Sequence, residues 1–404
     1  MFADRPSTAS GIRMLHPTRL TSTGATAIIL VVAAMGAFSL LVHDGAFPAE
    51  RADSTADWLA ASALAAGLDP HADLRQLAQT LDVEYWEGYV GRDRAVRIPR
   101  TPGALVVLYP LSWMTPEQAR QLMLLGGLMA TAATFLLLWR AEALAWVVVL
   151  LGTALAMVSG PARWSQLFVT QSAIVMLCVA AVLVTARRGD FARTGFALAI
   201  AGSLKVFPLV LLVLLVARRR YRALAFTFGS LAVLNMTPLL LPHVSMAAML
   251  DAFTLTTQSW IDITPGLPGL LAQRMTLGLP VILLIGAVLL TPAVVLVLRQ
   301  SLTYAVGAGV LLAAALLALP LSWPHYLLSL VPAFVLMTRE APAKSLAVVL
   351  GVGVLLLTPM TPIIVHTLGL LVILVGTTTS AIIAGQSQSR EDGPATIDHA
   401  EMVT

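Results

Sequence analysis

A few polar side chains in this sequence stand inside or beside apolar runs, where a polar group is costly and is therefore a functional candidate. Asp53 and His325 could act as general bases on a hydroxyl group. Lys205 could hold a phosphate and stabilise the charge that develops on it as it leaves. The other candidates are Asp57, Arg163, Gln171, Arg274 and Trp323.

Other kinds of site are not indicated. The sequence shows no His, Cys, Asp or Glu cluster with metal-ligand spacing and no glycine-rich loop that could cradle phosphates. Cys178 is the single cysteine and lies in an apolar run, so an internal disulfide is not possible. We therefore expect neither a metal nor a cofactor.

Composition places these side chains in a membrane protein. Of the 404 residues, 58% are hydrophobic and 11% are charged, whereas a soluble protein carries roughly 25% charged residues. The net charge of +4 does not indicate nucleic acid as a partner, because the basic residues cluster at the ends of apolar runs, as cytoplasmic loops do. We expect an all-α polytopic membrane protein surrounded by membrane lipids.

The N-terminal part of the sequence indicates which segments face the cytoplasm and which face the outside. A basic cytoplasmic segment, 1–24, precedes a first spanning helix over 25–42, and the polar stretch 44–115 is then a large outer loop. Within that loop, helical spacing of apolar residues over 53–67 predicts an amphipathic helix along the membrane surface. The segment 103–113 is too short to span and predicts an interfacial or re-entrant element.

A helical hairpin is predicted over 194–217. Read as one crossing, this run would separate the basic clusters 187–193 and 218–222, which the positive-inside rule disfavours. Lys205 and Pro208 interrupt the run at its middle. Each arm would rise ~16 Å and would carry Lys205 about halfway into a ~30 Å hydrocarbon core.

The remaining apolar runs complete the topology. They lie near 117–138, 143–159, 166–186, 223–241, 279–298, 302–320, 325–338, 345–358 and 363–384. With the first helix they predict about ten crossings, and the hairpin is a re-entrant element in addition. The membrane domain is then 25–384, and both ends of the chain lie in the cytoplasm. The polar tail 385–404 is expected to be disordered.

This topology gathers the candidates at the outer face, with Lys205 approaching from within the membrane. Arg97, Arg100 and Asp262 fall on the same side. A cavity open to the outer leaflet would hold carboxylates, arginines, a histidine and a lysine. That inventory suits attack of a hydroxyl group on a lipid-phosphate sugar, which could enter sideways with its phosphate at headgroup depth. A soluble nucleotide sugar is a poor candidate donor.

Six segments follow one another in the order of a known family. They are 53–70, 102–111, 170–172, 203–224, 267–274 and 320–326. The most specific are the lysine inside an apolar hairpin, Lys205, and the Ser-Trp-x-His segment at a helix start, 322–325. Together they resemble glycosyltransferase family 87 of the GT-C superfamily, which includes actinobacterial polyprenol-phosphate-mannose-dependent mannosyltransferases.

The sequence also departs from the pattern of that family. Asp57 stands where an aromatic residue is usual, Arg100 where a tyrosine is usual, and Pro324 where an acid is usual. The segment Thr264-Pro265-Gly266 replaces an Asn-Gln-Ser. These departures bear on which substrate is used.

The resemblance implies a GT-C-like hexosyltransferase in the inner membrane of a bacterium, with its site on the outer face. A hexose, mannose by resemblance, would pass with inversion from a polyprenyl-phosphate sugar to a glycolipid or a lipid-linked glycan. Asp53 falls on the family's catalytic aspartate and would be the base, with His325 as a second catalytic group. Lys205, Arg274 and Arg163 would bind the donor phosphate, and the substrate cavity would be lined by Asp57, Trp58, Gln171, Trp323 and Tyr326.

Each candidate also has a structural interpretation. Asp53 could cap the surface helix, and His325 could be an interfacial histidine beside a Trp anchor. Lys205 could snorkel from the hairpin tip. Arg163 and Arg274 could be anchors at the lipid headgroups, and Gln171 could form an interhelical hydrogen bond.

Two other functions stay open. A secondary transporter or a flippase for lipid-linked glycans would also be polytopic, although such folds usually show internal repeats and paired charges near the midplane. No repeat is visible in this sequence. The second is a non-catalytic membrane scaffold, if the departures from the family pattern reflect loss of activity.

Overall fold

The computed structural model describes residues 53–83, 97–142, 159, 165, 169–261, 266–272, 275, 278–300, 302–337, 372, 375 and 376. These residues form helices and their connections, with no strand among them. The predicted all-α class is therefore confirmed for this part of the chain. The predictions for 1–52, for the runs near 143–159, 345–358 and 363–384, and for the tail lie wholly or largely outside the described residues.

The described helices differ widely in length. The α-helices are α2 (Asp53–Ala65), α3 (Leu74–Thr80), α4 (Pro102–Leu108), α5 (Pro116–Glu142), α8 (Ser172–Arg188), α9 (Phe191–Leu204), α10 (Leu211–Ala217), α11 (Tyr221–Leu239), α12 (Met246–Trp260), α13 (Leu267–Ala272), α14 (Leu279–Arg299), α15 (Tyr304–Ala318) and α16 (Val331–Met337). Three 3-10 helices are η3 (Tyr109–Trp113), η4 (Phe207–Val210) and η6 (Pro324–Leu330).

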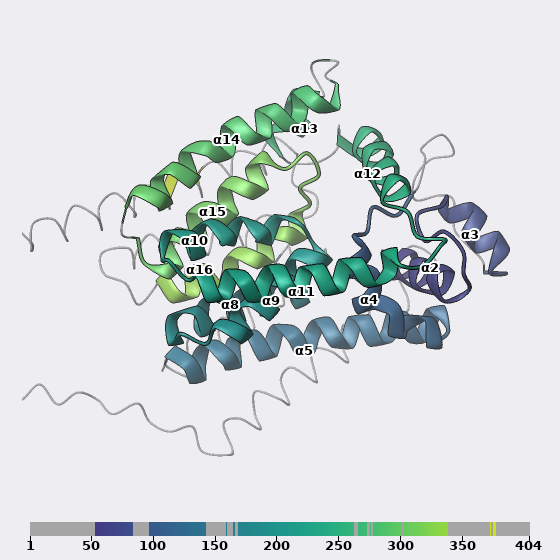
Figure 1. Ribbon diagram of the computed structural model, residues 1–404, viewed down its shortest axis with the longest axis horizontal. Helices are drawn as coiled ribbons and strands as arrows, with labels where there is room; N and C mark the ends of the chain where they lie inside the picture. Colours follow the sequence, from purple (N-terminus) through teal and green to yellow (C-terminus); the bar gives the residue numbers. More distant parts are fainter. Residues whose placement is uncertain are drawn as a thin grey trace, which may run out of the picture.

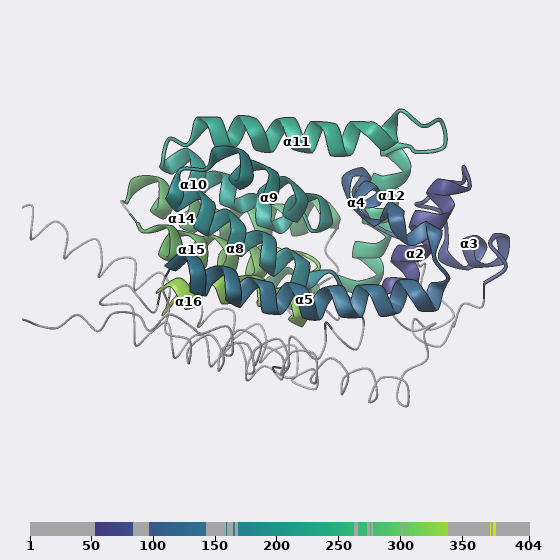
Figure 2. The ribbon, with the colours of Figure 1, turned by 90° about the horizontal axis from the view of Figure 1, so that it is seen from below.

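The long helices form a bundle with a group of short helices at one end. Helix α8 packs between α5 and α9, and α9 in turn packs against α11. Helix α15 packs against α14 and α16 on another side of the bundle. Both views place α2, α3, α4 and α12 together at one end (Figures 1 and 2). The candidate side chains of the outer loop belong to this end.

Local sequence signals explain the turn between α8 and α9. Gly189 takes the left-handed conformation, with φ of 74°, that ends α8, and glycine adopts it without a steric penalty. The Asp190 carboxylate then accepts a hydrogen bond of 3.1 Å from the Arg193 amide and caps α9. Arg187 and Arg188 occupy the last turn of α8, where positive charge complements the helix dipole.

The chain doubles back at the interruption in the run 194–217. Helix α9 ends at Leu204, and the backbone of Lys205, its C-cap, is extended. The chain then continues through η4, which packs against α9, into α10. The Arg220 guanidinium, beyond the second arm, lies 5.5 Å from the ring centre of Phe191 at the start of the first arm. The two basic clusters therefore lie at the same end of the bundle. Their assignment to the cytoplasmic side stays a prediction.

Two described helices, α5 and α14, are long and apolar enough to cross a membrane. Helix α14 exposes large apolar side chains, among them Leu284 and Val288, as a lipid-facing helix does. The protein is thus helical with apolar helices, consistent with a membrane protein. The count of about ten crossings stays a prediction.

Helix α2 corrects one expectation from the sequence. It was predicted to lie along the membrane surface with one polar face, yet nearly every residue from Ser54 to Leu64 is buried. The helix packs against α4, α5 and η3, and the Trp58 indole donates a hydrogen bond of 2.8 Å to the Met114 carbonyl oxygen. Its polar residues face other protein groups instead of water, so the prediction of an amphipathic surface helix was wrong.

Helix α12 lies between the apolar runs 223–241 and 279–298 and was not predicted from the sequence. Ser245 begins it by accepting hydrogen bonds from the amides of Ala247 and Ala248 at 3.2 and 3.4 Å. A serine before apolar residues at helical spacing is a helix start signal, and it could have revealed this element. The helix matters because it contacts the loop that leads into α4.

Candidate active site

Seven polar or aromatic side chains gather where the short helices meet the bundle. Six were predicted as site residues, and the seventh, Arg100, was placed on the same side of the membrane without a role. They come from the start of α2, the loop before α4, the N-terminus of α8, the break in the hairpin and the start of η6. The set, called the polar cluster below, is Asp53, Asp57, Arg100, Gln171, Lys205, His325 and Tyr326.

Asp57 lies at the buried side of the polar cluster. Its side chain is 1% exposed, and the Arg100 Nε donates a hydrogen bond of 2.6 Å to its Oδ1 atom. The Gln171 Nε2 donates one of 2.5 Å to its Oδ2 atom. A buried carboxylate requires such partners because its desolvation is expensive. With both oxygens engaged, Asp57 is suited to hold its neighbours in place more than to accept a proton.

Asp53 differs from Asp57 although they are one turn apart. It is the first residue of α2 and is only partly buried, and no described side chain forms a hydrogen bond with its carboxylate. Burial is the main cause that raises its pKa; the charges of Arg100 and Lys205 oppose this, and Asp57 adds to it. A raised pKa and a free carboxylate are the properties of a general base.

Lys205 reaches the polar cluster from the hairpin break. Its Nζ atom donates a hydrogen bond of 3.2 Å to the Tyr326 hydroxyl and lies 4.8 Å from the centre of that ring. The Tyr326 ring stacks on Phe207 at 5.3 Å. Because Phe207 begins η4, the residues that break the hairpin also fix the lysine.

His325 is buried beside Tyr326. It is 4% exposed, and neither ring nitrogen has a hydrogen-bond partner among the described residues. Its ring meets the Tyr326 ring edge-on at 4.8 Å. An imidazole buried without a partner is costly and requires an explanation, and a bound substrate group would supply one. Gln171 Oε1 is also buried without a partner in the described part of the chain.

The loop before α4 is held from both sides. Arg97 forms an ion pair with Asp251 of α12, and its carbonyl oxygen accepts a hydrogen bond of 3.0 Å from the Thr256 hydroxyl. His71 Nδ1 donates to the Ile98 carbonyl oxygen at 3.0 Å. Burial lowers the pKa of His71, so a neutral ring fits this contact.

The remaining predicted residues lie elsewhere. Trp58 packs in the apolar core of the short helices, and Trp323 meets Trp260 edge-on at 6.0 Å. Arg163 and Arg274, predicted to bind phosphate, lie outside the described residues, as does Asp262. Among the residues described, no group of three or more His, Cys, Asp or Glu could hold a metal, and the absence of a metal or cofactor stays a prediction.

The sequence profile of glycosyltransferase family 87 matches residues 101–320, which is more than half of the chain. The chain belongs to glycosyltransferase family 87. It is therefore a glycosyltransferase with a sugar donor and an acceptor, and the transporter and scaffold alternatives lose their basis. Neither a curated protein nor a solved structure matches the chain.

The stretch that matches the family includes only part of the polar cluster. Gln171 and Lys205 lie within 101–320, whereas Asp53 and Asp57 precede this stretch and His325 follows it. Arg100 stands one residue before it. The sequence placed Arg100 on the side of the predicted cavity but gave it no role there. A signal for a role was present, because Asp57 and Arg100 both stand where the resemblance leads us to expect other residues, and these two residues form an ion pair with each other.

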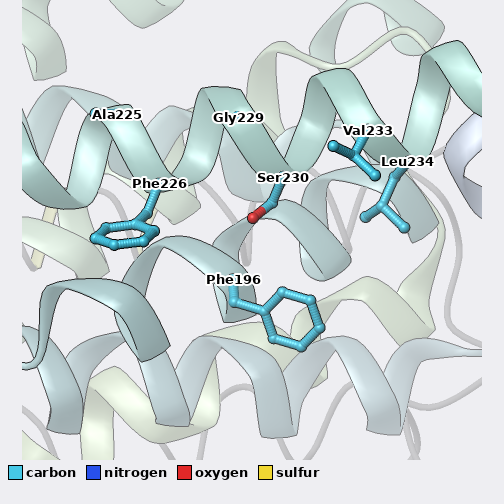
Figure 3. Close-up of a pocket in the computed structure, with 7 residues that line it drawn as sticks. All are labelled: Phe196, Ala225, Phe226, Gly229, Ser230, Val233 and Leu234. Carbon is cyan, nitrogen blue, oxygen red and sulfur yellow. The ribbon is translucent and has the colours of Figure 1, made fainter.

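A groove on the surface of this glycosyltransferase lies between α9 and α11 (Figure 3). Phe196 of α9 lies across the groove from Phe226 and Ser230 of α11, and Ser230 is the one polar side chain among the residues that line it. None of these lining residues belongs to the polar cluster. The groove offers apolar contact and no group for proton transfer or charge stabilisation.

Proposed function

We propose that this glycosyltransferase moves a hexose, with mannose suggested by resemblance, from a polyprenyl-phosphate sugar to a glycolipid or lipid-linked glycan. The reaction would occur at the outer face of the inner membrane of a bacterium. The observation that carries the proposal is the Asp53 carboxylate, which no described side chain hydrogen-bonds and which lies within electrostatic range of two cations, Arg100 and Lys205. A base next to cations is what attack of a hydroxyl group on a phosphate-linked sugar requires.

The chemistry is a single displacement. Asp53 takes the proton of the acceptor hydroxyl, and the hydroxyl oxygen bonds to the anomeric carbon of the donor sugar. The bond from that carbon to the phosphate oxygen breaks on the opposite face, and its electron pair leaves with the polyprenyl phosphate. The configuration at the anomeric carbon is thereby inverted. Lys205 stabilises the negative charge that appears on the phosphate, and Arg274 and Arg163 stay proposed phosphate ligands.

His325 supports this chemistry in a second role. Neither nitrogen of its buried imidazole has a hydrogen-bond partner in the part of the chain that the structure describes, and the ring lies within electrostatic range of Lys205 and Arg100. It would bind a substrate hydroxyl or exchange a proton near Asp53. Trp323, two residues before it, and Tyr326, directly after it, would contact the sugar or the acceptor.

The test is transfer of radiolabelled mannose from polyprenyl-phosphate mannose to a membrane lipid extract. We expect Asp53→Asn to lower the rate about 10²- to 10⁴-fold, the usual contribution of a general base. The matched control is Asp82→Asn, the same change at an exposed residue whose φ of 54° suits asparagine. Full activity of folded Asp53→Asn would remove Asp53 from the mechanism. If the wild type transfers no sugar from any polyprenyl-phosphate sugar, the donor class is wrong.

A further inference from the structure

The Arg100 guanidinium has a hydrogen-bond partner at one nitrogen, and its other two nitrogens have none within the described part of the chain. Its Nε donates to the buried Asp57 carboxylate at 2.6 Å, and its side chain is 14% exposed. Neither Nη1 nor Nη2 forms a hydrogen bond within the described part of the chain, and neither is sealed from solvent. A guanidinium held in this way offers planar N–H donors that fit two oxygens of a phosphate.

A second contact links the residue after Arg100 to the chain just before the hairpin break. Thr101, the next residue, donates a hydrogen bond of 2.6 Å from its hydroxyl to the Ser203 carbonyl oxygen. Ser203 is two residues before Lys205, and Arg100 is within electrostatic range of Tyr326, the partner of Lys205. Arg100 and Lys205 thus approach one region from two different elements, with Asp53 near both.

We propose that Arg100 binds the phosphate of the lipid-linked sugar donor, and that Asp57 and Gln171 are the residues that position it. This inference rests on the proposed function, because it assigns the phosphate ligand within that reaction. Asp57 fixes the Arg100 Nε, and Gln171 holds the second oxygen of Asp57. Arg100 and Lys205 are then a pair of cations for one phosphate, and Arg274 is not needed for that pairing.

The charge change of the reaction fits this assignment. The donor phosphate is a diester with one negative charge, and the released polyprenyl phosphate is a monoester that gains a second. The electron pair of the broken carbon–oxygen bond provides that charge, and the proton of the acceptor stays on Asp53. Donors already fixed in place stabilise a developing charge without reorganising. Arg100 should therefore favour the released lipid phosphate even more strongly than the donor.

The central experiment measures binding of polyprenyl phosphate to the purified full-length protein in nanodiscs of neutral phosphatidylcholine. Arg100→Lys keeps the charge beside Asp57 but loses the planar fork. We expect it to weaken binding of polyprenyl phosphate and raise the donor KM about 10- to 100-fold, the range for a lost hydrogen bond to a charged group. The acceptor KM should not change. Arg97→Lys is the matched control, because Arg97 is in the same loop but pairs with Asp251.

A second variant removes the risk of an orphaned buried charge. The pair Asp57→Asn with Arg100→Gln eliminates both charges together, so the fold does not retain an unpaired carboxylate. We expect this protein to fold and to bind polyprenyl phosphate as weakly as Arg100→Lys or more so. Unchanged binding in both variants, with only the acid limb of the pH–rate profile moved, would show that Arg100 acts on Asp53 alone and would overturn the proposal.

Two further measurements distinguish a donor site from a general phospholipid site, and failure of the Arg100 assignment from failure of the proposed function. Equal, Arg100-dependent binding of phosphatidic acid would identify a general phospholipid site and overturn the assignment to the donor. If wild type binds no polyprenyl phosphate, the donor class of the proposed function fails and this assignment fails with it. If wild type binds it and Arg100→Lys binds it equally well, only the assignment of Arg100 fails.

Discussion

Helices α2 and α15 are both buried, but for different reasons. Every residue of α15 from Ala305 to Ala318 is buried, and all of them are apolar or glycine. Helix α2 buries Ser54, Thr55 and Asp57 beside its alanines. An apolar helix needs only close neighbours, whereas a buried carboxylate needs specific partners. Helix α15 therefore supports the bundle, whereas α2 holds a charged site in place.

Removing the buried carboxylate of α2 should have the greatest effect on stability. Asp57→Ala leaves the Arg100 guanidinium without its carboxylate partner, so we expect it to lower the free energy of unfolding by about 3–5 kcal/mol. Thermal unfolding of the purified protein in detergent measures the loss. Leu312→Ala on α15 should cost a comparable ~2–5 kcal/mol through a cavity.

The two losses should differ in their rescue. Adding Arg100→Gln to Asp57→Ala removes the orphaned charge. The double variant should therefore lose less stability than the sum of the two single variants, by a coupling energy of about 0.5–3 kcal/mol. Arg100→Gln should not rescue Leu312→Ala, because Arg100 and the α15 core are separate. Equal behaviour of the two helices in this cycle would refute the distinction between them.

A smaller effect sharpens the contrast between Asp53 and Asp57. Asp53 must be ionised to act as a base, so kcat/KM should fall as the pH drops through its raised pKa. The charged groups around it are Arg100 and Lys205, which lower that pKa, and Asp57, which raises it. Lys205→Met removes one cation, and we expect the acid limb of the pH–rate profile to move to higher pH.

The same pKa direction makes a statement about stability. Because the pKa of Asp53 is higher in the folded than in the unfolded protein, its contribution to stability is present at low pH and is lost as the pH rises through the folded value. At neutral pH, Asp53→Asn should therefore unfold at the same temperature as the wild type or a slightly higher one. A fall of the unfolding temperature as large as that of Asp57→Ala would assign Asp53 a structural role.

The smallest effect concerns the opposite end of the bundle. Asp190→Ala removes the cap of α9 and should cost about 1 kcal/mol of stability. Sugar transfer should be unchanged when compared at a temperature where both proteins are folded. A specific loss of donor binding would show that the cap region communicates with the polar cluster.

Part of the site could be predicted because the relevant signals are local. Lys205 in an apolar run, Pro208 just after it and the flanking basic clusters indicated a chain that doubles back, and the contact of Arg220 with Phe191 agrees with that geometry. The sequence identified the polar residues of α2 but did not show that they face other protein groups and not the membrane surface. Helical periodicity locates a polar face without telling whether water or protein covers it.

The helical class, the apolar composition of a membrane protein, the break at Lys205 and the residue types that the chemistry needs can all be inferred from the sequence. Which of the two carboxylates has hydrogen-bond partners among the described side chains depends on the tertiary structure. Asp57 meets Arg100 and Gln171 across 43 and 114 positions of the chain, and no local pattern encodes a contact at such separation. Charges buried in a low dielectric must find partners wherever the packed helices bring them, and that packing assigned Arg100 to the site.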